Sequence, residues 1–75
     1  MVSLKYSGYF YLIQFEIGHT VYIKTDPDQM ERIITEVKLK PNGTIMYEVS
    51  CDTISSFHYD FELSTERNIV KLTTN

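Results

Sequence analysis

The chain has few of the residues that stabilise or specialise a small protein. Its 75 residues include one cysteine, Cys51, so no internal disulfide can form. No Cys/His spacing matches a structural zinc site. The three glycines are isolated from one another, which excludes a phosphate-binding loop, a dinucleotide fingerprint and a nucleophile elbow. Because a domain of this length is marginally stable by itself, we expect a compact barrel or a second subunit to supply stability.

Long apolar runs and an excess of basic residues are also missing. No run approaches the roughly 18 residues of a membrane-spanning helix. The first fifteen residues lack the apolar core and cleavage site of a signal peptide, which together with the unpaired thiol leads us to expect a cytoplasmic protein. The net charge of −3 weighs against non-specific nucleic-acid binding. Within residues 41–67, Arg67 alone offsets five acidic side chains, which predicts an acidic, solubilising surface.

Residues 33–51 carry the clearest pattern that is present, a β-hairpin. Pro41, Asn42 and Gly43 suit a three-residue loop, with Gly43 in the left-handed region. With Lys40 opposite Thr44, the alternation predicts that one face carries the pairs Leu39–Ile45, Val37–Tyr47, Thr35–Val49 and Ile33–Cys51. The hairpin therefore indicates a small, mainly antiparallel β domain.

Other segments extend this domain. A strand is predicted over 19–24, followed by one helical turn or a 3₁₀ turn capped by Asp26. After a polar connection over 52–56, residues 57–63 alternate, which predicts a strand with aromatic residues inward and His58, Asp60 and Glu62 outward. A turn over 64–68 and a strand over 69–72 would end the fold. The predicted core consists of Val21, Ile23, Ile33, Val37, Leu39, Tyr47, Val49, Phe57, Tyr59 and Phe61.

Residues 1–14 are dense in apolar and aromatic side chains, with an unbroken run from Tyr9 to Ile13. An exposed strand of this composition would favour aggregation through its edge. We therefore expect the segment to be ordered, either as a strand of the same domain or as a contact between two copies of the chain. A disordered extension is the alternative.

From Phe15 onward, the order of parts resembles a small SH3-like barrel: FxIGHTVYIKTD, a variable loop, a long hairpin, an aromatic strand and a short turn. More narrowly, IGHTVYIKTDPDQMERIITEV, PNG, YEVSC and HYDFELS resemble short uncharacterised proteins of Bacteroidetes genomes and their prophages. The resemblance implies a mainly β fold, an SH3-like antiparallel β-barrel of about five strands with one or two single-turn helices. It divides the single domain, 1–75, into an extension over 1–14, a barrel body over 15–66 and a C-terminal strand or tail over 67–75. The chain departs from the pattern at residues 1–14 and at Asp52, where a glycine is more familiar.

Three constellations could carry chemistry, and each has a structural interpretation that we prefer. His58, Asp60 and Glu62 could bind a metal or transfer protons, but three residues along one strand converge poorly on a tetrahedral site. Cys51 near His19 or His58 could be a nucleophile, but the pattern places Cys51 among core residues. Glu36 and Glu48 face each other on an open strand face, which is not a catalytic environment. We therefore expect no catalytic, metal or cofactor site.

The tyrosines are the best candidates for a binding surface. Exposed aromatic side chains on a small barrel can stack on peptides or bases, although tyrosines also cover thin cores. The sequence thus favours a non-enzymatic binding or adaptor module that contacts a protein, phage- or mobile-element-associated by the resemblance. The alternative is a nucleic-acid-associated factor of the KOW or Tudor type, whose basic residues would be Lys24, Arg32, Lys38 and Lys40. The candidate partner-binding residues are Tyr6, Tyr9, Tyr11, Tyr22 and Lys24.

Overall fold

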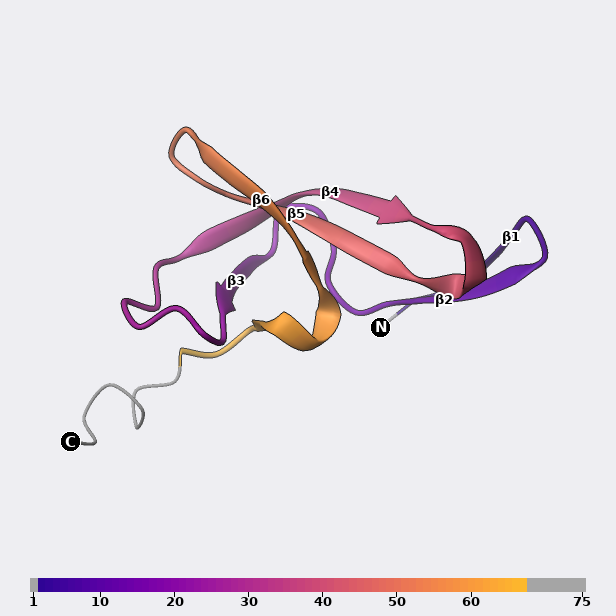
Figure 1. Cartoon of the computed structure of the whole chain (residues 1–75), viewed down its shortest axis with the longest axis horizontal. Coiled ribbons are helices and arrows are strands. Elements are labelled where there is room, and N and C mark those ends of the chain that lie inside the picture. The colour runs from indigo at the N-terminus through magenta and orange to yellow at the C-terminus, as the bar shows by residue number, and fades with distance from the viewer. Residues whose placement is uncertain (1, 68–75) are drawn as a thin grey trace.

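The computed structural model describes residues 2–67, which form two antiparallel sheets (Figure 1). A two-stranded sheet pairs β1 (Val2–Tyr6) with β2 (Tyr9–Ile13). A five-stranded sheet has the order β6-β5-β4-β3-β7. Its strands are β3 (Thr20–Ile23), β4 (Arg32–Leu39), β5 (Ile45–Cys51), β6 (Ile54–Tyr59) and β7 (Leu63–Ser64). The mainly β, antiparallel class is confirmed, but no strand pairing between β6 and β7 closes the described part into a barrel.

The hairpin β4–β5 has the predicted loop. Lys40 donates its backbone N–H to the Thr44 carbonyl oxygen at 2.8 Å, and Gly43 has φ +78°. The three loop residues form a single 3₁₀ turn, η1 (Pro41–Gly43), in which Asn42 also has positive φ. Near the loop, the pairs Leu39–Ile45 and Val37–Tyr47 are as predicted.

A bulge changes the register farther from the loop. Ile34 pairs with Val49 and Glu36 pairs with Glu48, so Thr35 is an extra residue in β4. Its hydroxyl donates to Glu48 Oε1 at 2.8 Å. The predicted pairs Thr35–Val49 and Ile33–Cys51 are therefore wrong. Because the bulge reverses the alternation, Ile34 is fully buried and Ile33 is 49% exposed.

The alternation predicted for residues 57–63 is reversed in β6 and then interrupted. His58 pairs with Tyr47 and so shares the inner face, whereas Phe57 pairs with Glu48 on the outer face. The Lys38 ammonium lies 5.1 Å from the centre of the Phe57 ring, which gives this aromatic a partner outside the core. The chain then leaves the strand in a 3₁₀ turn, η2 (Asp60–Glu62), and Phe61 is 69% exposed. Phe57 and Phe61 are thus not core residues, and Tyr59 is half-buried.

The core is formed by residues of both sheets and of the loop that joins them. Its buried apolar members are Tyr11, Phe15, Val21, Ile34, Ile45, Tyr47, Val49 and Leu63, with Ile13, Ile23, Val37 and Leu39 packed at the margin. The rings of Phe15 and Tyr47 meet edge to face at 5.3 Å. The prediction was correct for Val21, Tyr47 and Val49, and it missed Tyr11, Phe15, Ile34, Ile45 and Leu63.

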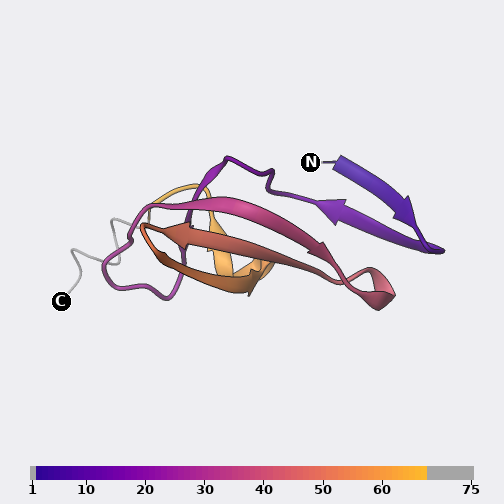
Figure 2. The ribbon, with the colours of Figure 1, turned by 90° about the horizontal axis from the view of Figure 1, so that it is seen from above.

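Within the N-terminal segment, residues 2–13 form the hairpin β1–β2, joined by Ser7 and Gly8, which both have positive φ. The strand β2 lies beside η1, at the end of the β4–β5 hairpin (Figure 2). A Cβ on Gly43 would sit 2.7 Å from the Phe10 carbonyl oxygen, so only glycine fits this approach. The Tyr11 hydroxyl donates to the Lys40 carbonyl oxygen at 2.6 Å, and the Gln14 N–H donates to Tyr47 Oη at 3.0 Å.

Of the helical or 3₁₀ turn predicted after Asp26, the structure has a single turn, closed by the Gln29 N–H, which donates to the Asp26 carbonyl oxygen at 3.2 Å. Gln29 has φ +48°, so the turn does not continue into a helix. The Asp26 carboxylate accepts the N–H groups of Asp28 and Met30, each at 3.0 Å. The predicted strand over 69–72, and the tail 67–75 except Arg67, lie outside the described residues. Within residues 2–67, no helix is long and apolar enough to cross a membrane.

Candidate functional site

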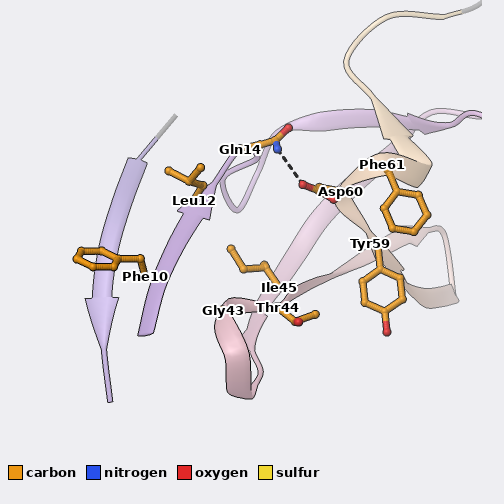
Figure 3. Close-up of a pocket in the computed structure, with 9 residues that line it drawn as sticks. All are labelled: Phe10, Leu12, Gln14, Gly43, Thr44, Ile45, Tyr59, Asp60 and Phe61. Atoms are coloured by element: carbon orange, nitrogen blue, oxygen red, sulfur yellow. Dashed lines mark hydrogen bonds between the residues drawn. The ribbon is translucent and has the colours of Figure 1, made fainter. Parts of the chain in front are cut away.

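The strand β2 directs alternate side chains to opposite sides, and a groove lies on each side of it. The larger, about 540 Å³, is the aromatic groove (Figure 3). Its walls come from β2, from the η1–β5 junction and from the end of β6 with η2. The lining residues are Phe10, Leu12, Gln14, Gly43, Thr44, Ile45, Tyr59, Asp60 and Phe61.

Two segments far apart in the sequence contribute exposed apolar side chains to opposite ends of the aromatic groove. Phe10 and Leu12 project from β2, and Phe61 projects from η2; all three are more than half exposed. The Tyr59 and Phe61 rings are stacked, with centres 5.5 Å apart and planes inclined by 7°. Because large apolar side chains are normally covered, their convergence on one groove is typical of a binding surface.

One polar contact spans the aromatic groove. Gln14 Nε2 donates to Asp60 Oδ2 at 2.8 Å, which joins β2 to η2 (Figure 3). Among the described residues, Asp60 forms no salt bridge, so its negative charge is not neutralised. On β2, the Lys5 ammonium lies 5.5 Å from the centre of the Phe10 ring. The groove thus has exposed apolar side chains at both ends, a carboxylate at one wall and a cation beside the other.

The smaller groove, about 420 Å³, is the tyrosine groove, and it holds three of the predicted site residues. Tyr6, Tyr9 and Tyr11 line it together with Ser7, Leu39, Lys40 and Pro41. Tyr6 and Tyr9 are exposed, as a stacking surface requires. Tyr11 is a core residue whose hydroxyl is already bonded, so the prediction that it contacts a partner is not supported by its burial.

The other two predicted site residues lie on or just after β3, away from both grooves. Tyr22 is half-buried, and the Arg67 guanidinium covers its ring at 5.1 Å. Lys24 is exposed, and its backbone N–H donates to the Glu62 carbonyl oxygen at 2.8 Å. The five predicted residues therefore form no single site. Phe10, Leu12, Tyr59 and Phe61 were missed because the alternation assigned Tyr59 and Phe61 to the core and left the orientation of β2 open.

The predicted row His58, Asp60 and Glu62 separates in the structure. Asp60 faces Gln14, while His58 Nδ1 lies 3.4 Å from Glu62 Oε2 and His58 Nε2 lies 2.7 Å from Ser56 Oγ. Hydroxyl, imidazole and carboxylate thus follow the order of a nucleophile relay. However, neither groove includes Ser56 or His58. We assign the contacts a structural role, which is to hold η2 against β6.

The Glu62 carboxylate is held in its charged form. The backbone N–H of Tyr59 donates to Glu62 Oε1 at 2.8 Å and is the main cause that lowers the pKa of Glu62; burial partly opposes it and His58 adds to it. Likewise, the N–H groups of Met30 and Asp28, with Arg32, lower the pKa of Asp26. Both carboxylates thus stabilise the turns in which they lie by accepting hydrogen bonds from backbone N–H groups.

The remaining candidates do not form chemical sites within the described residues. Cys51 is half-buried and forms no hydrogen bond with His19 or His58. Glu36 and Glu48 pair across the hairpin, as predicted, on its outer face. No cluster of three or more His, Cys, Asp or Glu residues suited to a metal occurs in the part of the chain that the structure describes.

The basic residues of the nucleic-acid alternative are also dispersed or engaged. Arg32 forms a salt bridge with Asp26 at 3.3 Å, and Lys38 covers Phe57. Lys40 Nζ lies 3.8 Å from Met46 Sδ.

Comparison with known proteins adds no assignment: no protein-family model, no curated protein and no solved structure matches this chain.

Proposed function

We propose that this chain is a non-enzymatic binding module whose aromatic groove holds an extended segment of a partner protein. The observation that carries the proposal is the convergence of exposed Phe10, Leu12 and Phe61 on a groove built from three distant segments. Such a groove offers apolar contact and stacking surfaces to side chains of an extended peptide. The candidate relay and the paired carboxylates lie outside it, which is why binding is favoured over catalysis.

The charges of the groove indicate the chemistry of the segment. Asp60 has no cationic partner among the described residues, and the chain carries a net charge of −3. A segment with apolar or aromatic side chains and a neighbouring Lys or Arg would complement this surface. The Lys5 ammonium beside Phe10 would favour the opposite charge at the other end of the segment and so set its direction.

The SH3-like relationship is part of the same proposal. Its support is the order of parts: β3, a loop, the long hairpin β4–β5, the strand β6, the single turn η2 and a short last strand that returns to β3. Association with a phage or mobile element rests on the sequence resemblance alone. Fold class by itself does not identify a ligand, so the groove carries the functional argument.

The alternative, a nucleic-acid-associated factor of the KOW or Tudor type, has less support. Such a factor needs Lys and Arg clustered on one face. Here Arg32 is paired with Asp26, and Lys38 is engaged with Phe57 on the outer face. We expect the chain to elute from heparin at low salt; retention to high salt would instead favour the alternative.

Selection of random linear peptides displayed on phage tests the groove. The natural chain should enrich peptides that combine aromatic or aliphatic residues with Lys or Arg. Phe61→Ser should abolish their binding while changing the free energy of unfolding by less than about 0.5 kcal/mol, because the side chain is exposed. The matched control is Phe57→Ser, which removes an exposed aromatic from the outer face and should leave binding unchanged.

The charge requirement has its own variant. Asp60→Asn keeps an acceptor for Gln14 and removes the negative charge. It should therefore lower the affinity for the selected basic peptides by about tenfold or less. Enriched peptides that bind Phe61→Ser and the natural chain equally well would contradict the proposal, as would a selection that enriches nothing.

A further inference from the structure

The outer strand β1 has no strand neighbour on one side. Among the described residues it pairs with β2 only, and all five of its residues are exposed. In an antiparallel strand, alternate N–H and C=O groups point away from the existing neighbour, so the outer edge of β1 presents unpaired backbone groups. In Figure 1, β1 and the end of β2 project beyond the five-stranded sheet.

This edge has few of the features that protect edge strands. The register between β1 and β2 is continuous from Val2–Ile13 to Tyr6–Tyr9, so no bulge twists the strand away. It contains no proline, and Lys5 is its single charged residue. Natural proteins seldom leave such an edge open, because it pairs readily with other chains.

One face of this hairpin is apolar throughout, and only part of it is covered. The cross-strand pairs place Val2, Leu4 and Tyr6 on the same face as Ile13, Tyr11 and Tyr9. The five-stranded sheet and its loop cover Tyr11, which is 2% exposed, whereas Tyr6 is 61% exposed. The exposed half lies along β1, next to the open edge.

The sequence of β1 is complementary to itself when the strand is turned by a two-fold axis at Leu4. Antiparallel pairing then sets Val2 against Tyr6 of a second copy, Ser3 against Lys5, and Leu4 against Leu4. Every apolar residue stays on one face, and no like charges meet. A pairing centred on Lys5 would place two ammonium groups together. No acidic residue precedes Glu16, so the negative charge of the chain lies outside the contacting strands.

From this complementarity we propose that two copies of this chain associate by antiparallel pairing of their β1 strands, centred on Leu4. The product is a four-stranded sheet in the order β2-β1-β1-β2, with Val2, Leu4 and Tyr6 of both β1 strands on one face. Because the contact is two-fold and self-complementary, it closes at two chains and leaves no further β1 edge. The Ser3 and Lys5 side chains form two polar pairs on the opposite face.

The mass in solution tests the association. Sedimentation equilibrium of the full chain should give twice the 8.8 kDa chain mass at high concentration. Leu4→Lys places two ammonium groups at the two-fold axis and should give the single-chain mass. The control is Ile54→Lys, which replaces an exposed apolar residue of the edge strand β6 and should leave the dimer mass unchanged.

The register is tested by charge, which keeps the test valid even where Leu4→Lys disturbs the hairpin. Ser3→Glu should tighten the association, because each copy would face Lys5 of the other, and Ser3→Lys should weaken it. With two pairs in each dimer, the dissociation constant should change by about twofold to thirtyfold in each direction.

Crosslinking locates the axis. In a Cys51→Ser background, Leu4→Cys should form an intermolecular disulfide on mild oxidation, because identical residues meet only at the two-fold axis. Val2→Cys faces Tyr6 and should stay reduced. A single-chain mass at several hundred micromolar, equal effects of Ser3→Glu and Ser3→Lys, or equal crosslinking at both positions would each overturn the proposal.

Discussion

Two features of the structure require glycine at position 43. Its φ of +78° favours a residue without a side chain, and its Cα lies against the backbone of β2. The loop pattern Pro-Asn-Gly predicts the first requirement. The second depends on β2, which contacts η1 from a distant part of the chain. Gly43 therefore links the central hairpin to the candidate groove that it lines.

Replacing Gly43 separates the two requirements when Gly8 serves as the control. Gly8 has φ +81°, but a Cβ there would meet no atom within 4 Å. Gly8→Ala should therefore cost only the conformational penalty, about 1 kcal/mol. Gly43→Ala should cost clearly more, because the methyl group would collide with the Phe10 carbonyl oxygen. Urea unfolding measures both; equal losses would show that β2 does not approach Gly43 in solution.

Asp52 takes a backbone conformation that usually favours glycine. It lies in the two-residue turn between β5 and β6 with φ +56°, where a glycine would be unstrained. Aspartate is among the side chains that tolerate this region. The turn therefore forms with aspartate at this position, and Cys51 pairs with Ile54 across it.

At the scale of elements, η2 decides which side chains reach the aromatic groove. The turn ends the alternation of β6 and exposes Phe61 beside Tyr59, while Leu63 returns to the core. Its geometry depends on Glu62, which accepts the Tyr59 N–H and contacts His58. The charge of Glu62 should therefore contribute to the stability of the element that presents the groove.

Acid should remove this contribution. The pKa of Glu62 is lower in the folded state than its ordinary value of 4.5, so the stabilisation is complete above pH 4.5 and is lost as the pH falls through the folded pKa. Glu62→Gln should lower the free energy of unfolding at pH 6 by under about 1 kcal/mol, since the side chain is partly exposed. The difference from the natural chain should shrink as the pH falls below 4.5.

Urea unfolding between pH 3 and pH 6 measures this dependence. The control is Glu66→Gln, which removes an exposed carboxylate whose side chain has no hydrogen-bond partner among the described residues. It should show no comparable pH dependence. A Glu62→Gln difference that stays constant across this range would mean that the carboxylate charge does not support η2.

At the scale of the whole molecule, the hairpin β1–β2 completes the core. Tyr11 and Phe15 are buried against the five-stranded sheet, and the hydroxyl of Tyr47 accepts a hydrogen bond from Gln14. The same hairpin supplies walls to both grooves and, in the association proposed above, the contact between two copies. A paired molecule would carry two aromatic grooves on one continuous sheet, a consequence that depends on both proposals.

Removing residues 1–14 should therefore destabilise the chain even when it is dilute enough to be monomeric. Burial of side chains such as Tyr11 contributes about 1.5–3 kcal/mol each before ordering costs. For a domain of this size, the melting temperature should fall by about ten degrees or more. The comparison is a chain starting at Ser7, which keeps β2. It should no longer form a dimer, but it should retain more of the stability. An unchanged melting temperature without residues 1–14 would contradict this role.

The sequence by itself determined the β class, the loop at Pro41–Gly43, the register near that loop and the charge balance. These features are local: turn residues and short-range alternation depend on the backbone of a few neighbouring residues. Val21, Tyr47 and Val49 could be assigned to the core for the same reason. Alternation says which side chains share a face, but it does not say which face will be covered.

Only the tertiary structure decided the rest. Ile33 and Ile34 are chemically equivalent, and the bulge at Thr35, bonded to Glu48, buried Ile34. Phe57 and Phe61 could equally have entered the core, but Lys38 gives Phe57 an outer partner and η2 turns Phe61 outward. The aromatic groove could not be predicted because its three walls come from separate segments of the sequence and meet only when β2 packs against η1. Such contacts depend on long-range packing, to which local sequence patterns do not respond.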